Sequence, residues 1–209
     1  MATHPAIRPG AFIRYKFLNS LFLGLSVGAV FILYTPLSPA IFSAGGIGLA
    51  LGTLMVATQY RRILAPGWFF RLSLLVELIT LSGVAAVLIL PLELPLALFV
   101  YIGYQLTFSL GSYLVRCETL LMVSIEQLRK LDMAKQAGYL LGMAGAWGIY
   151  AGLEQFAGID GRAEQVISLH WVLVVIETLV LVSLWYAFNR DQLDTDHPLI
   201  DQESLLTRN

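Results

Sequence analysis

The chain has 209 residues, of which 57% are hydrophobic and only 13% are charged, and its mean hydropathy is +0.74. These values exclude an ordinary soluble domain of this size and predict an all-α, polytopic membrane protein whose surroundings are a lipid bilayer. The net charge of −1 gives no sign of a nucleic-acid partner, and the single cysteine, Cys117, excludes an intrachain disulfide.

Runs of about 20 apolar residues, the length that crosses a membrane, predict a bundle of six transmembrane helices. The predicted spans cover residues 17–36, 40–60, 70–91, 96–120, 137–156 and 167–188. Prolines lie between the first and second spans and between the third and fourth, where they favour chain reversals. The sequence therefore divides into a basic cytoplasmic N-terminus (1–16), a six-helix transmembrane domain (17–188) and an acidic cytoplasmic tail (189–209).

The positions of the basic residues predict the orientation of these spans. Twelve of the thirteen lysines and arginines fall on one side of the predicted membrane, and Arg162 alone falls on the other. Because loops rich in lysine and arginine stay in the cytoplasm, both termini are predicted to be cytoplasmic. We expect the protein in a bacterial cytoplasmic (inner) membrane.

Glycines recur at spacings of three and four residues in three spans, which leaves one face of each helix without side chains. The glycines predicted to pack helices together are Gly24, Gly28, Gly48, Gly52, Gly138, Gly142, Gly145, Gly148 and Gly152. They predict close packing inside one bundle, with dimerisation or a sliding surface in a moving transporter as the alternatives. The sixth span has no glycine and is rich in leucine, valine and isoleucine, which predicts a peripheral helix facing lipid on most sides.

Polar residues follow one face of the predicted fourth span. They are Tyr101, Gln105, Ser109, Ser112 and Arg116. Their spacing of three and four residues places them in a line along the helix. Such a line either hydrogen-bonds to neighbouring helices or borders a water-filled substrate path.

Two carboxylates lie inside predicted spans. Glu77 is six residues beyond Arg71, about 9 Å into the membrane, and Arg116 lies at a similar depth. An ion pair between Glu77 and Arg116 is therefore predicted, with Glu118 as a competing partner of the arginine. Glu177 lies deeper, roughly 15 Å from either end of the sixth span, and shares a helix face with His170.

A charged side chain near the middle of a membrane costs about 2.5 to 3.5 kcal/mol, which one apolar span can offset. Glu177 would therefore insert, but it would not remain ionised and unpaired in lipid. It either points into the bundle toward a partner or stays protonated. A protonated carboxyl of this kind serves proton-coupled carriers, whereas a neutral glutamate bonded between helices would be purely structural.

Six spans, a GxxxG pattern followed by a basic loop (LGTLMVATQYRRILAPG), and a glycine-rich fifth span make the chain resemble one six-helix half of a major facilitator superfamily transporter. The resemblance implies secondary transport, and it implies that a six-helix unit pairs with a second unit to enclose a path. The chain departs from the family in the loop, where the family carries an acidic residue and this chain has Gln59, Tyr60, Arg61 and Arg62.

Two functions follow from these features. The first is a small secondary transporter that works as a homodimer, in which the polar line of the fourth span contacts substrate and Glu77, Arg116 and Glu177 handle charge or protons. The second is a noncatalytic subunit or scaffold that docks on a larger membrane complex through its glycine faces. Convergence of these polar groups on a wet cavity would favour transport, and burial by packing would favour the subunit. No enzyme active site, metal site or cofactor is expected, because the sequence has no recognisable ligand spacing and no nucleophile with a paired base.

Overall fold

The computed structural model describes residues 6–122, 124–189 and 193, and these residues form eight α-helices and no β-strand. The helices are α1 (Pro9–Leu33), α2 (Pro39–Thr58), α3 (Tyr60–Ile63), α4 (Pro66–Ile89), α5 (Leu94–Ser109), α6 (Gly111–Leu121), α7 (Ile125–Ala157) and α8 (Arg162–Ala187). The all-α prediction is confirmed for this part of the chain. The predicted acidic tail lies almost entirely outside the described residues.

Local sequence explains where these helices begin. Proline occupies the first residue of α1, α2 and α4 and the second residue of α5. A proline at this position loses no helical hydrogen bond, and its fixed φ already matches the helix. At the start of α7, the Ser124 hydroxyl accepts a hydrogen bond from the Gln127 amide at 3.2 Å. The same helix ends at Gly158, which has a φ of 65° that favours glycine.

Five stretches are long and apolar enough to cross a membrane. They are Pro9–Leu33, Pro39–Thr58, Pro66–Ile89, Leu94–Leu121 and Arg162–Ala187. The fifth predicted span, 137–156, lies within α7, which is not among the five because glycines and polar residues lower its hydropathy. The chain therefore has five clear candidate spans and one long, less apolar helix.

Several predicted boundaries differ from the structure, and the largest difference is at α7, which begins at Ile125 rather than at residue 137. The first helix begins at Pro9, eight residues before the predicted start, so Phe12, Tyr15 and Lys16 are helical and buried. The predicted fourth span is interrupted at Leu110, where α5 ends and α6 begins.

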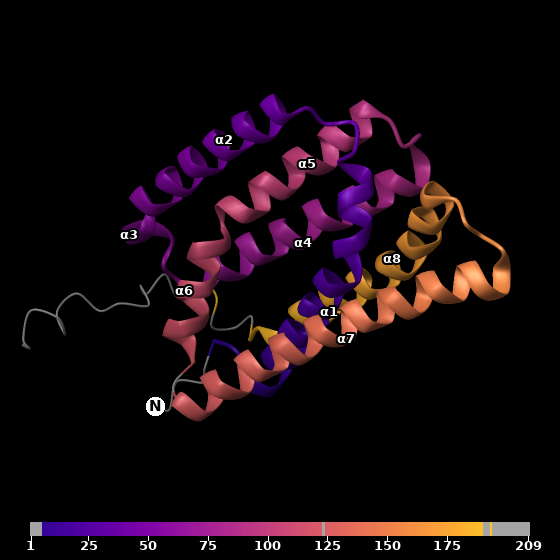
Figure 1. The fold of residues 1–209 in the computed structure, drawn as a ribbon. Helices are drawn as coiled ribbons and strands as arrows, with labels where there is room; N and C mark the ends of the chain where they lie inside the picture. Colours follow the sequence, from indigo (N-terminus) through magenta and orange to yellow (C-terminus); the bar gives the residue numbers. More distant parts are fainter. Residues whose placement is uncertain (1–5, 123, 190–192, 194–209) are drawn as a thin grey trace, which may run out of the picture.

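The six long helices pack in a simple order. Across the molecule, α7 lies against α1, α1 against α8, α8 against α4, α4 against α5, and α5 against α2 (Figure 1). The prediction that the last span is peripheral is wrong, because α8 lies between α1 and α4. Aliphatic side chains suit a protein core as well as lipid, so composition did not distinguish the two. The most exposed long helix is α2, which has no buried residue along its fully described length and packs chiefly on α5.

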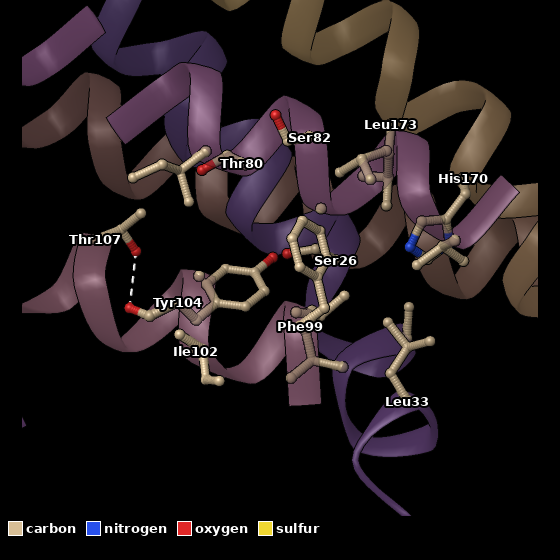
Figure 2. Close-up of a pocket in the computed structure, with 18 of the residues that line it drawn as sticks. Ser26, Leu33, Thr80, Ser82, Phe99, Ile102, Tyr104, Thr107, His170 and Leu173 are labelled. Carbon is tan, nitrogen blue, oxygen red and sulfur yellow. Dashed lines mark hydrogen bonds between the residues drawn. The ribbon is translucent and has the colours of Figure 1, made fainter. Parts of the chain in front are cut away.

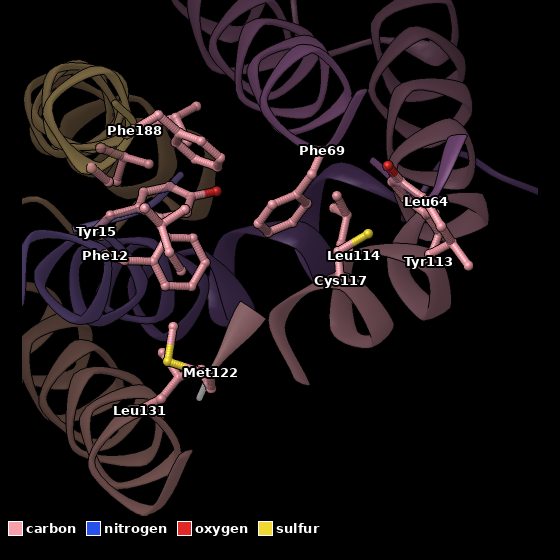
Figure 3. Close-up of a cluster of buried hydrophobic side chains, with 14 residues drawn as sticks. Phe12, Tyr15, Leu64, Phe69, Tyr113, Leu114, Cys117, Met122, Leu131 and Phe188 are labelled. Carbon is pink, nitrogen blue, oxygen red and sulfur yellow. The ribbon is translucent and has the colours of Figure 1, made fainter. Parts of the chain in front are cut away.

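An aromatic cluster holds one end of the bundle together (Figure 3). Phe12 on α1, Phe69 on α4 and Phe188 after α8 form it, with ring centroids 5.4 to 6.1 Å apart. The backbone joins the same end, since the Arg8 amide donates to the Ala187 carbonyl at 2.8 Å and the Asn189 amide donates to the Ala6 carbonyl at 2.9 Å. The start of α1 and the end of α8 are therefore neighbours.

Glycines allow the close packing of α1 against α7. A Cβ atom on Gly24 would overlap the Tyr139 carbonyl oxygen, and one on Gly138 or Gly142 would overlap carbonyl oxygens of α1. Gly28 and Gly145 meet side chains of the facing helix instead, at 3.2 and 3.4 Å. These five glycines therefore lie where α1 and α7 approach each other closely.

The remaining predicted glycines fall into two groups. Gly52 on α2 faces Ser109 of α5, where a Cβ atom would lie 2.5 Å from the hydroxyl oxygen. A Cβ atom added to Gly48, Gly148 or Gly152 would meet no atom of the described chain within 4 Å. These three glycines pack against no other helix within this part of the chain.

Candidate functional site

A buried ion cluster joins three helices near the start of α1. The Glu118 carboxylate on α6 forms an ion pair with the Lys16 ammonium group on α1 and a second one, at 3.2 Å, with the Lys135 ammonium group on α7. Only 4% of the Glu118 side chain and 8% of the Lys16 side chain are exposed, whereas Lys135 is 29% exposed. Each carboxylate oxygen faces one lysine, so the buried charge of Glu118 is compensated on both sides.

Glu77 on α4 forms hydrogen bonds with two side chains of α1 that lie close to Lys16 in the sequence. Its carboxylate accepts a hydrogen bond from the Tyr15 hydroxyl at 2.5 Å and further hydrogen bonds from the Asn19 amide nitrogen at 3.0 and 3.2 Å. Tyr15 and Asn19 are four residues apart and therefore share a face of α1. Because Tyr15 precedes Lys16 in the sequence, one turn of α1 links the Glu77 site to the ion cluster.

Glu177 on α8 completes the arrangement. Its carboxyl group is fully buried and close enough to Glu77 to interact with it. Neither oxygen of Glu177 has a hydrogen-bond partner that satisfies normal geometry among the described residues. Glu177 lies ten residues before the end of α8, about 15 Å along the helix. Two carboxyl groups thus meet deep within the bundle, and the structure confirms that Glu177 and His170 share its inner face.

The predicted ion pair between Glu77 and Arg116 is wrong. Arg116 is exposed and its guanidinium carbon lies 5.6 Å from the centre of the Tyr60 ring. Glu118, the predicted competitor, faces the opposite way, because residues two apart on a helix point in very different directions. The cation near Glu77 is Lys16, which the predicted boundaries placed in the N-terminal segment before the first span.

The polar line of the fourth span does not converge on these carboxylates. Tyr101 and Ser109 are buried and face Gly45 and Gly52 of α2, and the Tyr101 hydroxyl donates to the Phe42 carbonyl at 3.3 Å. The Ser109 hydroxyl donates to the carbonyl of Gln105, one turn earlier, at 2.8 Å. The Gln105 side chain is half-buried, and its Oε1 atom has no hydrogen-bond partner among the described residues, whereas Ser112 is exposed. The buried part of the line therefore serves the packing of α5 against α2.

A cavity of about 370 Å³ lies between α1, α4, α5 and α8 (Figure 2). Its first lining residue on α1 is Ser26, which follows Lys16 of the ion cluster by more than two helical turns. Its walls are mostly aliphatic, and its polar side chains are Ser26, Thr80, Ser82, Tyr104, Thr107 and His170. None of the residues of the predicted polar line borders it. In the sequence, His170 was notable only because it shares a helix face with Glu177. Isolated serine, threonine and tyrosine residues in apolar helices did not indicate a cavity.

Comparisons with known proteins add no family. No family model, no curated protein and no solved structure matches this chain. Within the described residues, no group of three or more histidine, cysteine, aspartate or glutamate side chains could hold a metal ion. A function for this chain therefore has to be inferred from the arrangement of its buried polar groups.

Proposed function

We propose that the chain crosses the membrane six times, with both ends on the cytoplasmic side of a bacterial inner membrane. The neighbouring positions of Ile7 and Phe188 support this, because a chain that starts and ends at one end of a bundle crosses it an even number of times. Five apolar spans need one more crossing, and α7 supplies it by packing closely along α1. The bias of basic residues places the shared end in the cytoplasm.

The packing order supports a relation between the first three spans and the last three. The relation maps the first three spans onto the last three: α1 onto α5–α6, α2 onto α7, and α4 onto α8. Under this exchange, the contact between α1 and α7 corresponds to the contact between α5 and α2. The contact of α1 with α8 becomes that of α5 with α4, and the contact of α4 with α8 is unchanged. Inverted repeats of three helices build each half of major facilitator transporters. This symmetry is the main support for the resemblance to such a half.

Charge balance suggests what the buried cluster does. It contains two lysines, Lys16 and Lys135, and three glutamates, Glu77, Glu118 and Glu177. The charges balance when one glutamate carries a proton, and Glu177 is the glutamate without a bonded donor among the described residues. A protonated Glu177 beside an ionised Glu77 is a proton-binding site at membrane depth.

The function that we propose is therefore secondary transport linked to proton binding at Glu177 and Glu77, by a homodimer of six-span units. The observation that carries it is the buried pair of carboxyl groups joined through α1 to the ion cluster. The packing order ends with α2 on one side and α7 on the other. Both helices carry glycines that contact no other described helix, and a second unit could cover these glycine surfaces. In this proposal, the polar line of the fourth span no longer contacts substrate.

The test uses purified protein in liposomes that contain a pH-sensitive dye. Pools of small metabolites are added under an imposed pH gradient, and a transported compound will change the internal pH. Glu177→Gln keeps the shape and neutrality of the protonated side chain, so it should remain folded while proton movement stops. Thr178→Val, one residue away on the exposed face, is the matched control and should transport normally. Equal proton movement in Glu177→Gln and the wild type would refute the proposal.

A noncatalytic membrane subunit is the second candidate. The observation that favours it is the sealing of Glu77 and Glu177 by packing, together with the surface position of Arg116. In this case the polar groups only pair helices, and the open glycines dock on a larger complex. Mild solubilisation should then recover the chain in an assembly far larger than a dimer, and Gly48→Leu or Gly148→Leu should release it. Recovery of a free monomer would contradict both candidates.

A further inference from the structure

The cavity between α1, α4, α5 and α8 opens toward the lipid. Its outer edge includes Leu78 on α4 and Phe99, Ile102 and Leu106 on α5, which are 45% to 56% exposed. Leu78 and Ile102 lie in the middle of their helices, away from either end. A molecule dissolved in the bilayer could therefore reach the cavity between α4 and α5.

Most polar groups in the cavity are already bonded. The hydroxyl groups of Ser26, Thr80, Ser82 and Thr107 donate to backbone carbonyls three or four residues earlier, at 2.7 to 3.0 Å. They therefore offer only weak acceptor positions to a ligand. None of the lining residues is an aspartate, glutamate, lysine or arginine, so the described walls provide no countercharge for an ionic ligand.

Two polar side chains of the cavity are not in this bonded set: Tyr104, whose hydroxyl points toward Ser26 (Figure 2), and His170, the lining residue with a ring nitrogen. His170 is 3% exposed, and its ring projects from α8 toward the cavity (Figure 2). Its Nδ1 atom lies 2.6 Å from the Val166 carbonyl oxygen. Because a carbonyl oxygen only accepts hydrogen bonds, Nδ1 carries the hydrogen, and Nε2 of the neutral ring is an acceptor. No described side chain or backbone group donates to Nε2.

We propose that this cavity binds a lipophilic alcohol or phenol that donates one hydrogen bond to His170 Nε2. The volume lies within the range of small-molecule sites, about 300 to 1,000 Å³. The aliphatic walls would bury the apolar body of the ligand, and the buried imidazole would select a molecule with a hydroxyl group over a pure hydrocarbon. The site is separate from the carboxyl pair, because His170 lies seven residues from Glu177 along α8, about 10 Å. Ligand binding at this site does not depend on the proposed transport.

The experiment uses the full chain in lipid nanodiscs and, as probe, 4-octylphenol that carries a diazirine in its chain. Photolabelling should be saturable and should map to lining residues of α4, α5 and α8. Unlabelled 4-octylphenol should displace the probe about tenfold better than octylbenzene, as expected for one hydrogen bond in an apolar site. In His170→Phe, which keeps a ring of similar size but removes the acceptor, this preference should disappear.

A second variant keeps the test decisive if His170→Phe does not fold. Gly83 lines the cavity, and a Cβ atom there would meet no described atom within 4 Å. Gly83→Leu should therefore fill the cavity and abolish saturable labelling without touching His170. Three results would overturn the proposal. They are labelling that does not saturate, equal displacement of the probe by octylbenzene and 4-octylphenol, and saturable labelling that persists in Gly83→Leu.

Discussion

Replacing Gly142 with alanine should force α1 and α7 apart. The added Cβ atom would overlap the Leu21 carbonyl oxygen and would also lie 2.8 Å from the Leu25 amide nitrogen and 2.9 Å from the Gly24 Cα atom. All three are backbone atoms of a regular helix, so none can move aside alone. The two helices must separate along their shared face, and the contacts on either side of Gly142 weaken as well.

The size of the effect follows from this rigidity. Inserting one extra carbon into a well-packed interface costs about 1 to 3 kcal/mol, and the absence of a flexible neighbour places Gly142→Ala toward the upper value. Gly148, in the same helix, meets no described atom within 4 Å of its Cβ position. Gly148→Ala should therefore gain up to about 1 kcal/mol from helix propensity. The two variants should differ by roughly 2 to 4 kcal/mol.

Thermal unfolding in a mild detergent measures this difference. For a chain of this size, a difference of 2 to 4 kcal/mol corresponds to roughly 4 to 16 °C in Tm, with Gly142→Ala the lower. The same order should appear in lipid nanodiscs. Equal Tm values for the two variants would show that α1 and α7 do not approach as closely as the structure describes.

Three further predictions concern other parts of the bundle. Lys16→Met should destabilise the protein by about 3 kcal/mol in the same unfolding assay, because it leaves Glu118 buried with one lysine, and adding Glu118→Leu should recover most of the loss. Outside the spans, the hydrogen bond from Arg129 lowers the pKa of Glu126. In Arg129→Gln, an NMR titration should therefore show the Glu126 carboxyl titrating at higher pH than in the wild type. An unchanged titration would contradict the pairing. Cys117 is fully buried and should react with maleimide only after denaturation.

The buried carboxylates show where prediction from sequence stops. The depth of Glu177 and the face it shares with His170 follow from residue spacing along one helix, and the structure confirms that this face is internal. The partner of Glu77 does not follow in this way. It depends on how α1 and α4 are rotated against each other, and on the start of α1 at Pro9, which makes its bonded partner Tyr15 part of the buried helix.

The sequence by itself determined the properties that depend on composition and on local geometry. These are the helical, apolar stretches long enough to cross a membrane, the prolines that begin helices, and the side-chain-free glycine faces that allow a close helix contact. Only the tertiary structure decided which groups meet: the pairing of Glu118 with two lysines, the central place of α8, and the cavity beside His170. The physical reason is that leucine, valine and isoleucine are equally suited to lipid and to a protein core, so the neighbours of each helix follow from the packing of all the helices together.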